Sequence, residues 1–200
     1  MELLRVMEER RSVRKYKKDK PVSDEEIGEL LEAFRWAPSE GNLQPWLVIA
    51  VKDSRIIKEL SLAAYDQGWI SGAPLVFVVC TDLKKTMNSF GERGMNLYSI
   101  QSTAAATQNM LLMAHYKELG TCWISAFEED KIYRILDLPE WVRPVAIITV
   151  GYPDEKPKVP LRLDVTDFTF EDKFGTESRV RWKGIGSIFK SLKKDEFEGL

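Results

Sequence analysis

The segment after Ser23 repeats apolar residues at helical spacing, in a stripe formed by Ile27, Leu30, Leu31 and Phe34. Ser23 and Glu26 have the spacing of a capping box, in which each side chain accepts a hydrogen bond from the other residue's backbone N–H. The stripe ends before Pro38, whose ring removes a helical hydrogen-bond donor. The pattern therefore predicts a helix that begins at Ser23 and buries one face in the core.

Continuous β-prone runs and further helical patterns cover most of the remaining chain. Buried strands are predicted at residues 46–51, 75–80, 121–125 and 145–150. Helices are predicted at residues 3–11, 54–65, 96–117 and 128–136. After Gly151, prolines and interspersed lysines mark a change to a tail that cannot build its own core, and such an arm often embraces a partner subunit.

The composition favours one soluble domain. Of the 200 residues, 44% are hydrophobic, which is enough for one sizeable core. The 29 Lys and Arg residues and 31 Asp and Glu residues give a net charge of −2, so no global positive field is available to hold a nucleic acid. No apolar run approaches the roughly 20 residues of a membrane span, and the N-terminus is too polar for a signal peptide. We expect a cytoplasmic protein that binds neither nucleic acid nor membrane.

The cysteine and histidine content disfavours two kinds of site. Cys80 and Cys122 are the only cysteines and His115 is the only histidine, so a disulfide scaffold and a zinc site are both disfavoured, and no metal is expected. Both cysteines are predicted to be buried small apolar residues. A hydrolase with a histidine base would rest on His115 alone, which we interpret instead as a helix residue.

The N-terminal segment Arg10–Tyr16 gathers three guanidinium groups around a hydroxyl. Arginine offers planar, bidentate donors, so this set suits a compact anion such as the terminal phosphate of a nucleotide. The alternative interpretation is a solvated basic helix end that the helix dipole favours. The lysines that continue the run at Lys17, Lys18 and Lys20 also resemble a nucleic-acid patch, which the acidic overall balance argues against.

A loop of turn formers and amide side chains spans residues 37–46. Its Ser, Asn and Gln residues supply uncharged donors and acceptors, which recognition of a flat heteroaromatic ring needs, although the loop taken alone is only an elaborate turn. Gly91 and Gly94 indicate a mobile segment nearby, but they lack the spacing of a dinucleotide fingerprint or a P-loop.

Taken together, these segments resemble the nitroreductase family of flavoproteins. The resemblance runs in order from about residue 1 to residue 175. Its matching segments are Arg10–Arg14, Ala37–Ser39, Asn42–Trp46, Ala73–Pro74, Thr107–Leu112, Leu119–Ile124 and Val150–Pro153, followed by Arg162.

The resemblance implies an α+β fold with a central, mostly antiparallel sheet flanked by helices. It further implies an intertwined homodimer that holds its long helix in the interface and binds FMN between the subunits. Residues 1–175 would form the FMN-binding domain, and residues 176–200 would be a C-terminal extension packed on the partner subunit.

The resemblance also assigns flavin-contacting residues by position. Arg10, Arg11, Ser12 and Arg14 would contact the phosphate, the ribityl chain or the ring edge, and Arg162 would add a phosphate contact. The partner chain would contribute further flavin contacts from Pro38, Ser39 and Asn42. The ring would be lined by Trp123, Ile124 and Ser125, with Gln67 as a further ring contact.

The implied activity is hydride transfer from NADH or NADPH, through the flavin, to a small aromatic acceptor such as a nitroaromatic or a quinone, in ping-pong order. The cofactor carries the chemistry, so no catalytic side chain is expected. Arg14 is expected to place a positive charge at the N1/O2 edge of the ring. Two alternatives stay open: an enzyme that uses reduced FMN with dioxygen or aromatic halides, and a flavin-binding or sensing protein without turnover.

Two positions depart from the family pattern. An acidic residue that is common near the start of the long helix is replaced in the run that contains Ser102, and a glycine that commonly follows Trp-Ile is replaced by Ser125. These departures concern details of the pocket and leave the flavin-binding segments intact.

Overall fold

The computed structural model of the chain describes residues 2–177. The chain divides into two compact units, Met1–Pro157 and Lys158–Leu200. Most of the predicted C-terminal extension, residues 178–200, lies outside the described residues.

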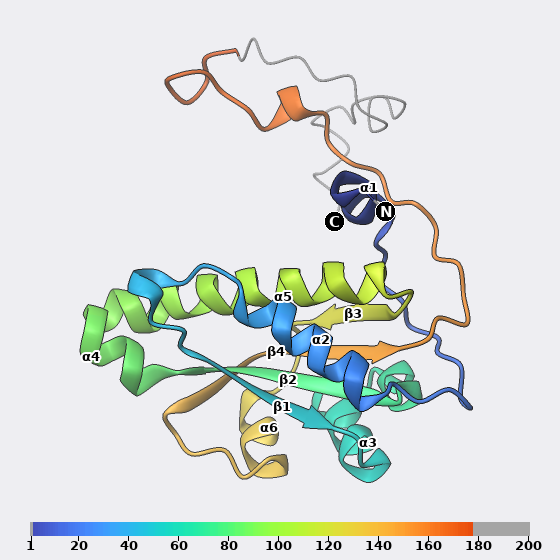
Figure 1. Cartoon of the computed structure of the whole chain (residues 1–200). Coiled ribbons are helices and arrows are strands. Elements are labelled where there is room, and N and C mark those ends of the chain that lie inside the picture. Colours follow the sequence, from blue (N-terminus) through green and yellow to red (C-terminus); the bar gives the residue numbers. More distant parts are fainter. Residues whose placement is uncertain (1, 178–200) are drawn as a thin grey trace. The chain divides into compact units, whose positions relative to one another are not determined.

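The first unit is built on a four-stranded antiparallel sheet in the order β1-β2-β4-β3 (Figure 1). Its strands are β1 (Trp46–Val51), β2 (Leu75–Asp82), β3 (Gly120–Ile124) and β4 (Val142–Gly151). The register pairs Phe77 of β2 with Ile148 of β4, and Ile148 in turn with Trp123 of β3. All four predicted strands are present, and the α+β fold with an antiparallel sheet is confirmed.

Helices cover both faces of this sheet. One face carries α2 (Asp24–Arg35) and α5 (Ser99–Tyr116), and the other carries α3 (Ser54–Ala63) and α6 (Glu129–Ile135), as Figure 1 shows. The helix α2 begins with the predicted capping box, in which Ser23 and Glu26 bond to each other's backbone N–H groups.

The burial of the strands follows from this layering. Along β2, Val76 and Val78 pack in the cluster shared with α3 and α6, whereas Phe77 and Val79 pack in the cluster shared with α2 and α5. Alternate residues of a strand point to opposite faces, so a strand covered on both sides must be apolar throughout. This requirement explains why residues 75–80 of β2 are a continuous hydrophobic run and why Cys80 within it is buried.

Two further helices lie at the ends of the unit. The helix α1 (Leu3–Glu9) buries only Val6, and α4 (Leu83–Arg93) leads through a π-helical turn at Gly94–Tyr98 into α5. Within α4, Gly91 has a φ of 60° and kinks the chain. The structure thus has a kinked helix where the glycines of the sequence indicated only a mobile segment.

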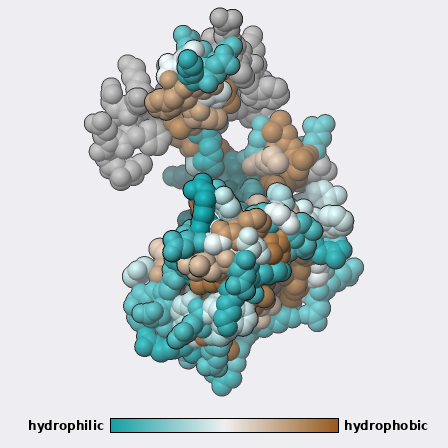
Figure 2. Space-filling view, turned by 90° about the vertical axis from the view of Figure 1, so that its left-hand side faces the viewer, coloured by the Kyte–Doolittle hydropathy of each residue, from teal (hydrophilic) through white to brown (hydrophobic). Residues whose placement is uncertain are grey.

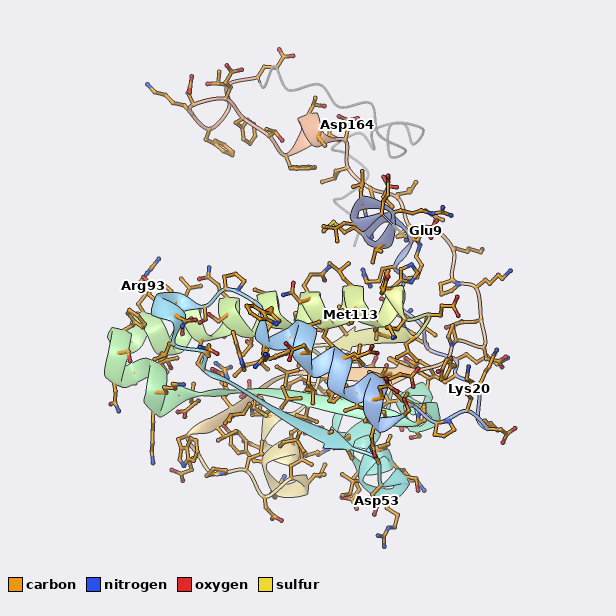
Figure 3. The ribbon with its side chains drawn as sticks, in the orientation of Figure 1. Glu9, Lys20, Asp53, Arg93, Met113 and Asp164 are labelled. Atoms are coloured by element: carbon orange, nitrogen blue, oxygen red, sulfur yellow. The ribbon has the colours of Figure 1, made fainter. Side chains whose placement is uncertain are left out.

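The surface at the α4 end mixes apolar and polar side chains. Figure 2 looks onto this side of the first unit and shows hydrophobic patches bordered by hydrophilic surface. Met87 and Phe90 of α4 are among the exposed large apolar residues of the chain. At this end of the unit lies Arg93, and Lys20 lies at the opposite end (Figure 3).

The second unit, taken by itself, is described for residues 158–177. It contains a single 3-10 turn at Val165–Asp167, which Asp164 caps. Several of its apolar side chains are exposed, with Phe174 at 92%. Phe170 and Phe174 pack against each other with ring centres 4.6 Å apart.

Among the described helices, none combines the length and apolar character needed to cross a membrane.

Candidate functional site

The arginine-rich segment is held along the free edge of β3. Ser12 forms a parallel bridge with Thr121, and the backbone N–H of Val13 donates to the carbonyl of Thr121 at 2.9 Å. Gly120 permits this close approach, because a Cβ there would come within 2.8 Å of the Val13 Cβ. The segment predicted to bind an anion is therefore fixed beside the sheet.

Buried Tyr16 anchors the other end of this segment. Its hydroxyl donates to the carbonyl of Val13 at 2.5 Å and lies 2.7 Å from the Thr149 hydroxyl. Burial raises the pKa of Tyr16 well above its usual value, so the phenol stays neutral and keeps its proton for this bond. These contacts tie the backbone on both sides of Arg14 to the core.

The backbone at Arg14 has a second support. One carboxylate oxygen of Glu155 accepts the backbone N–H groups of Arg14 and Lys15, at 2.5 and 3.1 Å. The side chain of Arg14 extends over the indole of Trp69, with the guanidinium carbon 5.6 Å from the ring centre. Arg14 thus carries a fixed positive charge next to an aromatic wall.

The other members of the segment have different surroundings. Arg11 donates to the carbonyls of Glu8 and Arg10 at 2.5 and 2.7 Å, so it caps the C-terminus of α1, as the alternative interpretation of the basic run expected. Arg10 is the C-terminal cap residue of α1. Ser12 lies against Cys122, whose thiol pKa is raised by burial, an effect that the charge of Arg14 and the hydrogen bond with Ser12 oppose.

Gln67 joins the loop after β3 to the 3-10 helix η2 (Gly68–Gly72). Its side-chain amide donates to the carbonyl of Ala64 at 2.9 Å and to that of Ala126 at 3.5 Å. Because Trp69 in η2 contacts Arg14, Gln67 belongs to the same neighbourhood as the arginine-rich segment.

The end of β3 supplies the remaining predicted lining residues. The indole N–H of Trp123 donates to the Ser125 hydroxyl at 2.9 Å, and both side chains are accessible, whereas Ile124 is buried in the core. Ile124 can therefore approach a ligand only through its backbone.

A groove of ≈ 720 Å³ opens beside Arg14 and Trp69. It lies between the backbone of residues 14–20 and η2, and Trp69 forms part of its wall. A volume of this size lies within the range of small-molecule sites.

The loop that carries Pro38, Ser39 and Asn42 forms a separate hollow. Ser39 accepts the backbone N–H of Gln44 at 2.9 Å, and Asn42 adopts a φ of 56°, a left-handed conformation that asparagine tolerates. The hollow has a volume of ≈ 370 Å³. Its lining consists of Pro38, Ser39, Glu40, Tyr98, Gln101, Ser102 and Ala105.

Glu40 ties this loop to α5. Its carboxylate accepts a hydrogen bond from the Ser102 hydroxyl, and its second oxygen, Oε1, is buried with no partner among the described residues. Ser102 belongs to the run in which the resemblance led us to expect an acidic residue, and the carboxylate of Glu40 lies against it.

The two sets of predicted residues lie near opposite ends of α5. Ser102 is in the first turns of the helix, whereas Thr121, beside Ser12, follows its C-terminus. The 18 residues of α5 span about 27 Å at 1.5 Å per residue. One chain therefore does not bring Asn42 and Arg14 to the same small ligand. Arg162 belongs to the second unit, where it donates to the carbonyl of Leu161.

Three residues that support these two neighbourhoods were not predicted from the sequence: Tyr16, Glu40 and Glu155. The partners of Glu40 and Glu155 are 62 and 141 positions away along the chain. No local sequence pattern predicts contacts between residues so far apart along the chain. For Tyr16, the Val-x-x-Tyr spacing before a basic run was the available signal.

Comparison with known proteins shows the family to which the chain belongs. The sequence model of the Nitroreductase family matches residues 7–71 and 61–152. The NADH dehydrogenase of Thermus thermophilus is 30% identical over 174 residues, covering 74% of this chain and 84% of the relative. The FMN reductase (NADPH) of Bacillus subtilis is 30% identical over 167 residues, covering 75% of this chain and 67% of the relative.

Solved structures agree with these sequence matches. The NfrA1 nitroreductase of B. subtilis superposes with a TM-score of 0.80 at 26% identity, covering 88% of this chain and 76% of that one. The structure of B. megaterium NfrA2 gives the same TM-score of 0.80 at 27% identity, covering 87% of this chain and 76% of that one. The chain belongs to the nitroreductase family.

Proposed function

We propose that this chain is an NAD(P)H-dependent FMN oxidoreductase, which passes a hydride equivalent to a small aromatic acceptor, a nitroaromatic or a quinone, in ping-pong order. Its family membership and relatives described as an FMN reductase and an NADH dehydrogenase support the proposal. The observation that carries it is the parallel pairing of Ser12 with Thr121 near the start of β3, which sets the arginine-rich segment alongside that strand.

The donor set of this neighbourhood fits FMN. Arg10 and Arg14 offer guanidinium groups and Ser12 a hydroxyl, which suits a phosphate and a polyol chain. The amide of Gln67 and the indole of Trp69 suit the polar edge and the face of a flat ring. Since cations, hydroxyl and aromatic surface occur together on a rigid frame, the residues present match the three parts of the cofactor.

When bound, FMN supplies the hydride-transfer chemistry, so the chain has to bind, orient and shield rather than react. Arg14, fixed by Glu155 and Trp69, would hold a positive charge toward the bound flavin and would stabilise the electron density that the ring gains on reduction. The accessible pair Trp123 and Ser125 contributes a flat surface and a hydroxyl beside the ring. Neutral Tyr16 keeps the backbone of this segment in register.

We propose further that the site is built by two copies of the chain. The Pro38–Asn42 loop and the arginine-rich segment lie at opposite ends of α5, so a loop from a second copy is the means of joining them. In this arrangement Pro38, Ser39 and Asn42 approach the flavin bound by the partner's arginine segment, and the long helix α5 lies in the interface.

For the chain organisation, we propose a flavin-binding domain at residues 1–175 and an extension at 176–200 that packs on the partner. Arg162 then adds a phosphate contact. Truncation after Gly175, followed by sedimentation, tests this assignment. A weaker dimer is expected, and a truncated dimer of undiminished stability would contradict the role of the extension.

The activity itself is tested by turnover. Purified holoprotein is mixed with NADH or NADPH and either a nitroaromatic or a quinone, and oxidation of the nicotinamide is followed by its absorbance. Parallel initial-rate lines in a two-substrate plot are expected for ping-pong order. A protein that retains FMN without oxidising either nicotinamide would instead be a flavin binder without turnover.

A further inference from the structure

The groove beside Arg14 is strongly basic. Of its eleven lining residues, five are Lys or Arg and two are Asp, in a chain whose overall net charge is −2. Its cations come from a single stretch, residues 14–20, and Lys20 marks that end of the unit in Figure 3. We call this hollow, lined by residues 14–20, Gly68, Trp69, Gly72 and Asp154, the basic groove.

Three of the five cations already have partners. Lys15 pairs with Asp154 at 3.2 Å, the ammonium group of Lys20 lies 3.4 Å from the ring centre of Tyr152, and Arg14 lies over Trp69. Within residues 2–177, Lys17 and Lys18 have no acidic partner. Their positive charges therefore remain available, with only Asp19 between Lys18 and Lys20 to offset them.

The backbone that carries these lysines is fixed. The N–H of Lys17 donates to the carbonyl of Tyr152 and the N–H of Asp154 donates to the carbonyl of Lys15, both at 2.9 Å. The segment is thus tied to the chain that leaves β4. A fixed frame reduces the ordering entropy that a ligand has to overcome, which distinguishes this groove from lysines on a loose surface loop.

The opposite wall is flat and open. Trp69 presents its indole, and a Cβ added at Gly68 or Gly72 would meet no atom within 4 Å. Space above the backbone together with an aromatic face suits a planar, anionic ligand. The groove also adjoins the proposed flavin site, because Arg14 belongs to both and Gln67 directly precedes Gly68.

We propose that the basic groove binds the phosphates of the nicotinamide dinucleotide while its nicotinamide lies at the flavin. The proposal rests on the proposed function and names Lys17 and Lys18 as specificity-determining residues for the reductant. A dinucleotide carries a pyrophosphate, and NADPH carries an additional phosphate. The unpaired ammonium groups of Lys17 and Lys18 therefore favour NADPH over NADH.

The test compares two hydride donors on the flavin-loaded protein. NADPH carries the phosphates, whereas N-benzyl-dihydronicotinamide carries none. The variants are Lys17→Gln and Lys18→Gln, singly and together, and Lys58→Gln on the surface of α3 is the matched control. The readout is the ratio of kcat/KM for NADPH to kcat/KM for the benzyl donor, and the bound FMN of each variant is measured by its absorbance.

We expect the double variant to lower this ratio about three- to tenfold at low ionic strength, because each exposed ion pair strengthens binding only modestly. The loss with NADPH should exceed the loss with NADH and should shrink near 1 M salt, where the Debye length is about 3 Å. The proposal is overturned if the double variant has the same ratio as Lys58→Gln. It is also overturned if kcat/KM falls equally with NADPH and with the benzyl donor.

The experiment separates three questions: whether the groove binds a reactant, which reactant it binds, and whether the protein binds FMN. A loss confined to an anionic acceptor such as para-nitrobenzoate would assign the groove to the acceptor and overturn the proposal. A normal flavin content with an unchanged donor ratio refutes the role of the groove and leaves the proposed oxidoreductase intact. Failure of the unmodified protein to bind FMN contradicts the proposed function itself.

Discussion

The guanidinium carbon of Arg14 lies 5.6 Å from the ring centre of Trp69. An exposed cation–π contact of this kind contributes roughly 0.5–1 kcal/mol. The contact holds the guanidinium group of Arg14 in place, whereas solvent and backbone motion would otherwise leave its charge poorly positioned. Since Glu155 fixes the backbone of Arg14 as well, the position of this charge is set both at its base and along its side chain.

Arg14→Ala is predicted to lower the two-electron reduction potential of bound FMN more than it weakens FMN binding. A lost interaction of about 1.4 kcal/mol with the electron-rich form corresponds to roughly 30 mV for a two-electron couple. Spectroelectrochemical titration gives the potential, and fluorescence titration gives the affinity.

Arg14→Lys is the control for that measurement, because lysine keeps the positive charge but lacks the planar, bidentate guanidinium group. Its potential should lie closer to that of the native protein. An unchanged potential in Arg14→Ala would show that the charge does not act on the ring edge.

Gly120→Ala is predicted to destabilise the protein and to weaken its hold on FMN. The new Cβ would come within 2.8–2.9 Å of three Val13 side-chain atoms and force the arginine-rich segment away from β3. Overpacking of this kind costs about 1–3 kcal/mol, or a fall in Tm of roughly 2–12 °C for a chain of this size. Thermal denaturation and FMN titration measure the two effects.

Gly28→Ala in α2 is the matched control, because a Cβ there meets no atom within 4 Å. Alanine is a better helix former than glycine by about 1 kcal/mol, so this variant should have a raised Tm and native FMN affinity. If both glycine variants behave alike, the contact between Gly120 and Val13 does not set the position of the segment.

Co-expression of two damaged chains is predicted to restore one flavin site. In the proposed dimer, Arg14→Ala damages the site on its own chain, whereas Asn42→Gly damages the site of the partner. Glycine accepts the φ of 56° at this position, so the loop keeps its path. A heterodimer of the two variants, isolated with two different tags, then has one native site and one doubly damaged site.

The measurement is the FMN content and activity of that heterodimer against each variant homodimer. We expect activity near half the native value. Activity no higher than that of the variant homodimers would mean that each site is built within one chain.

The stability of the protein is predicted to fall as the pH drops from about 7 to about 5. Burial lowers the pKa of His115, and the positive charges of Arg10 and Arg11 act in the same direction, while Glu9 opposes them. The unfolded chain, whose histidine titrates near 6.5, therefore takes up the proton first, and stability is lost as the pH falls through about 6.5.

His115→Gln should flatten this part of the profile of Tm against pH. The comparison stays above about pH 5 because carboxylates titrate below it. An equal slope in the variant and the native protein would show that His115 does not contribute to the loss.

The sequence predicted the elements whose patterns are local. The capping box at Ser23 and the hydrophobic run of β2 each lie within a few consecutive residues, so the sequence alone predicts them. Both are present in the structure. The helix α4 was missed because its residues are largely polar, although Asp82, which caps it by accepting the N–H of Lys85, was a usable start signal.

The candidate site was predictable only in part, for a related reason. Arg10–Arg14 form a compact group along the chain, so residue types alone indicated an anion site. The supports of that group come from elsewhere. Neither the carboxylate of Glu155 nor the ring of Trp69 follows from any spacing, because tertiary packing alone brings them to Arg14.

The measurement that tests the central claim most directly is a visible absorption spectrum of the purified protein. It is recorded after FMN is added and free flavin removed by desalting, and again after anaerobic addition of NADH or NADPH. We predict a retained flavin spectrum that bleaches with the nicotinamide. Loss of all flavin on desalting would contradict the assignment of Arg10, Ser12, Arg14 and Gln67 to a flavin site, and a retained spectrum that neither nicotinamide bleaches would contradict the oxidoreductase.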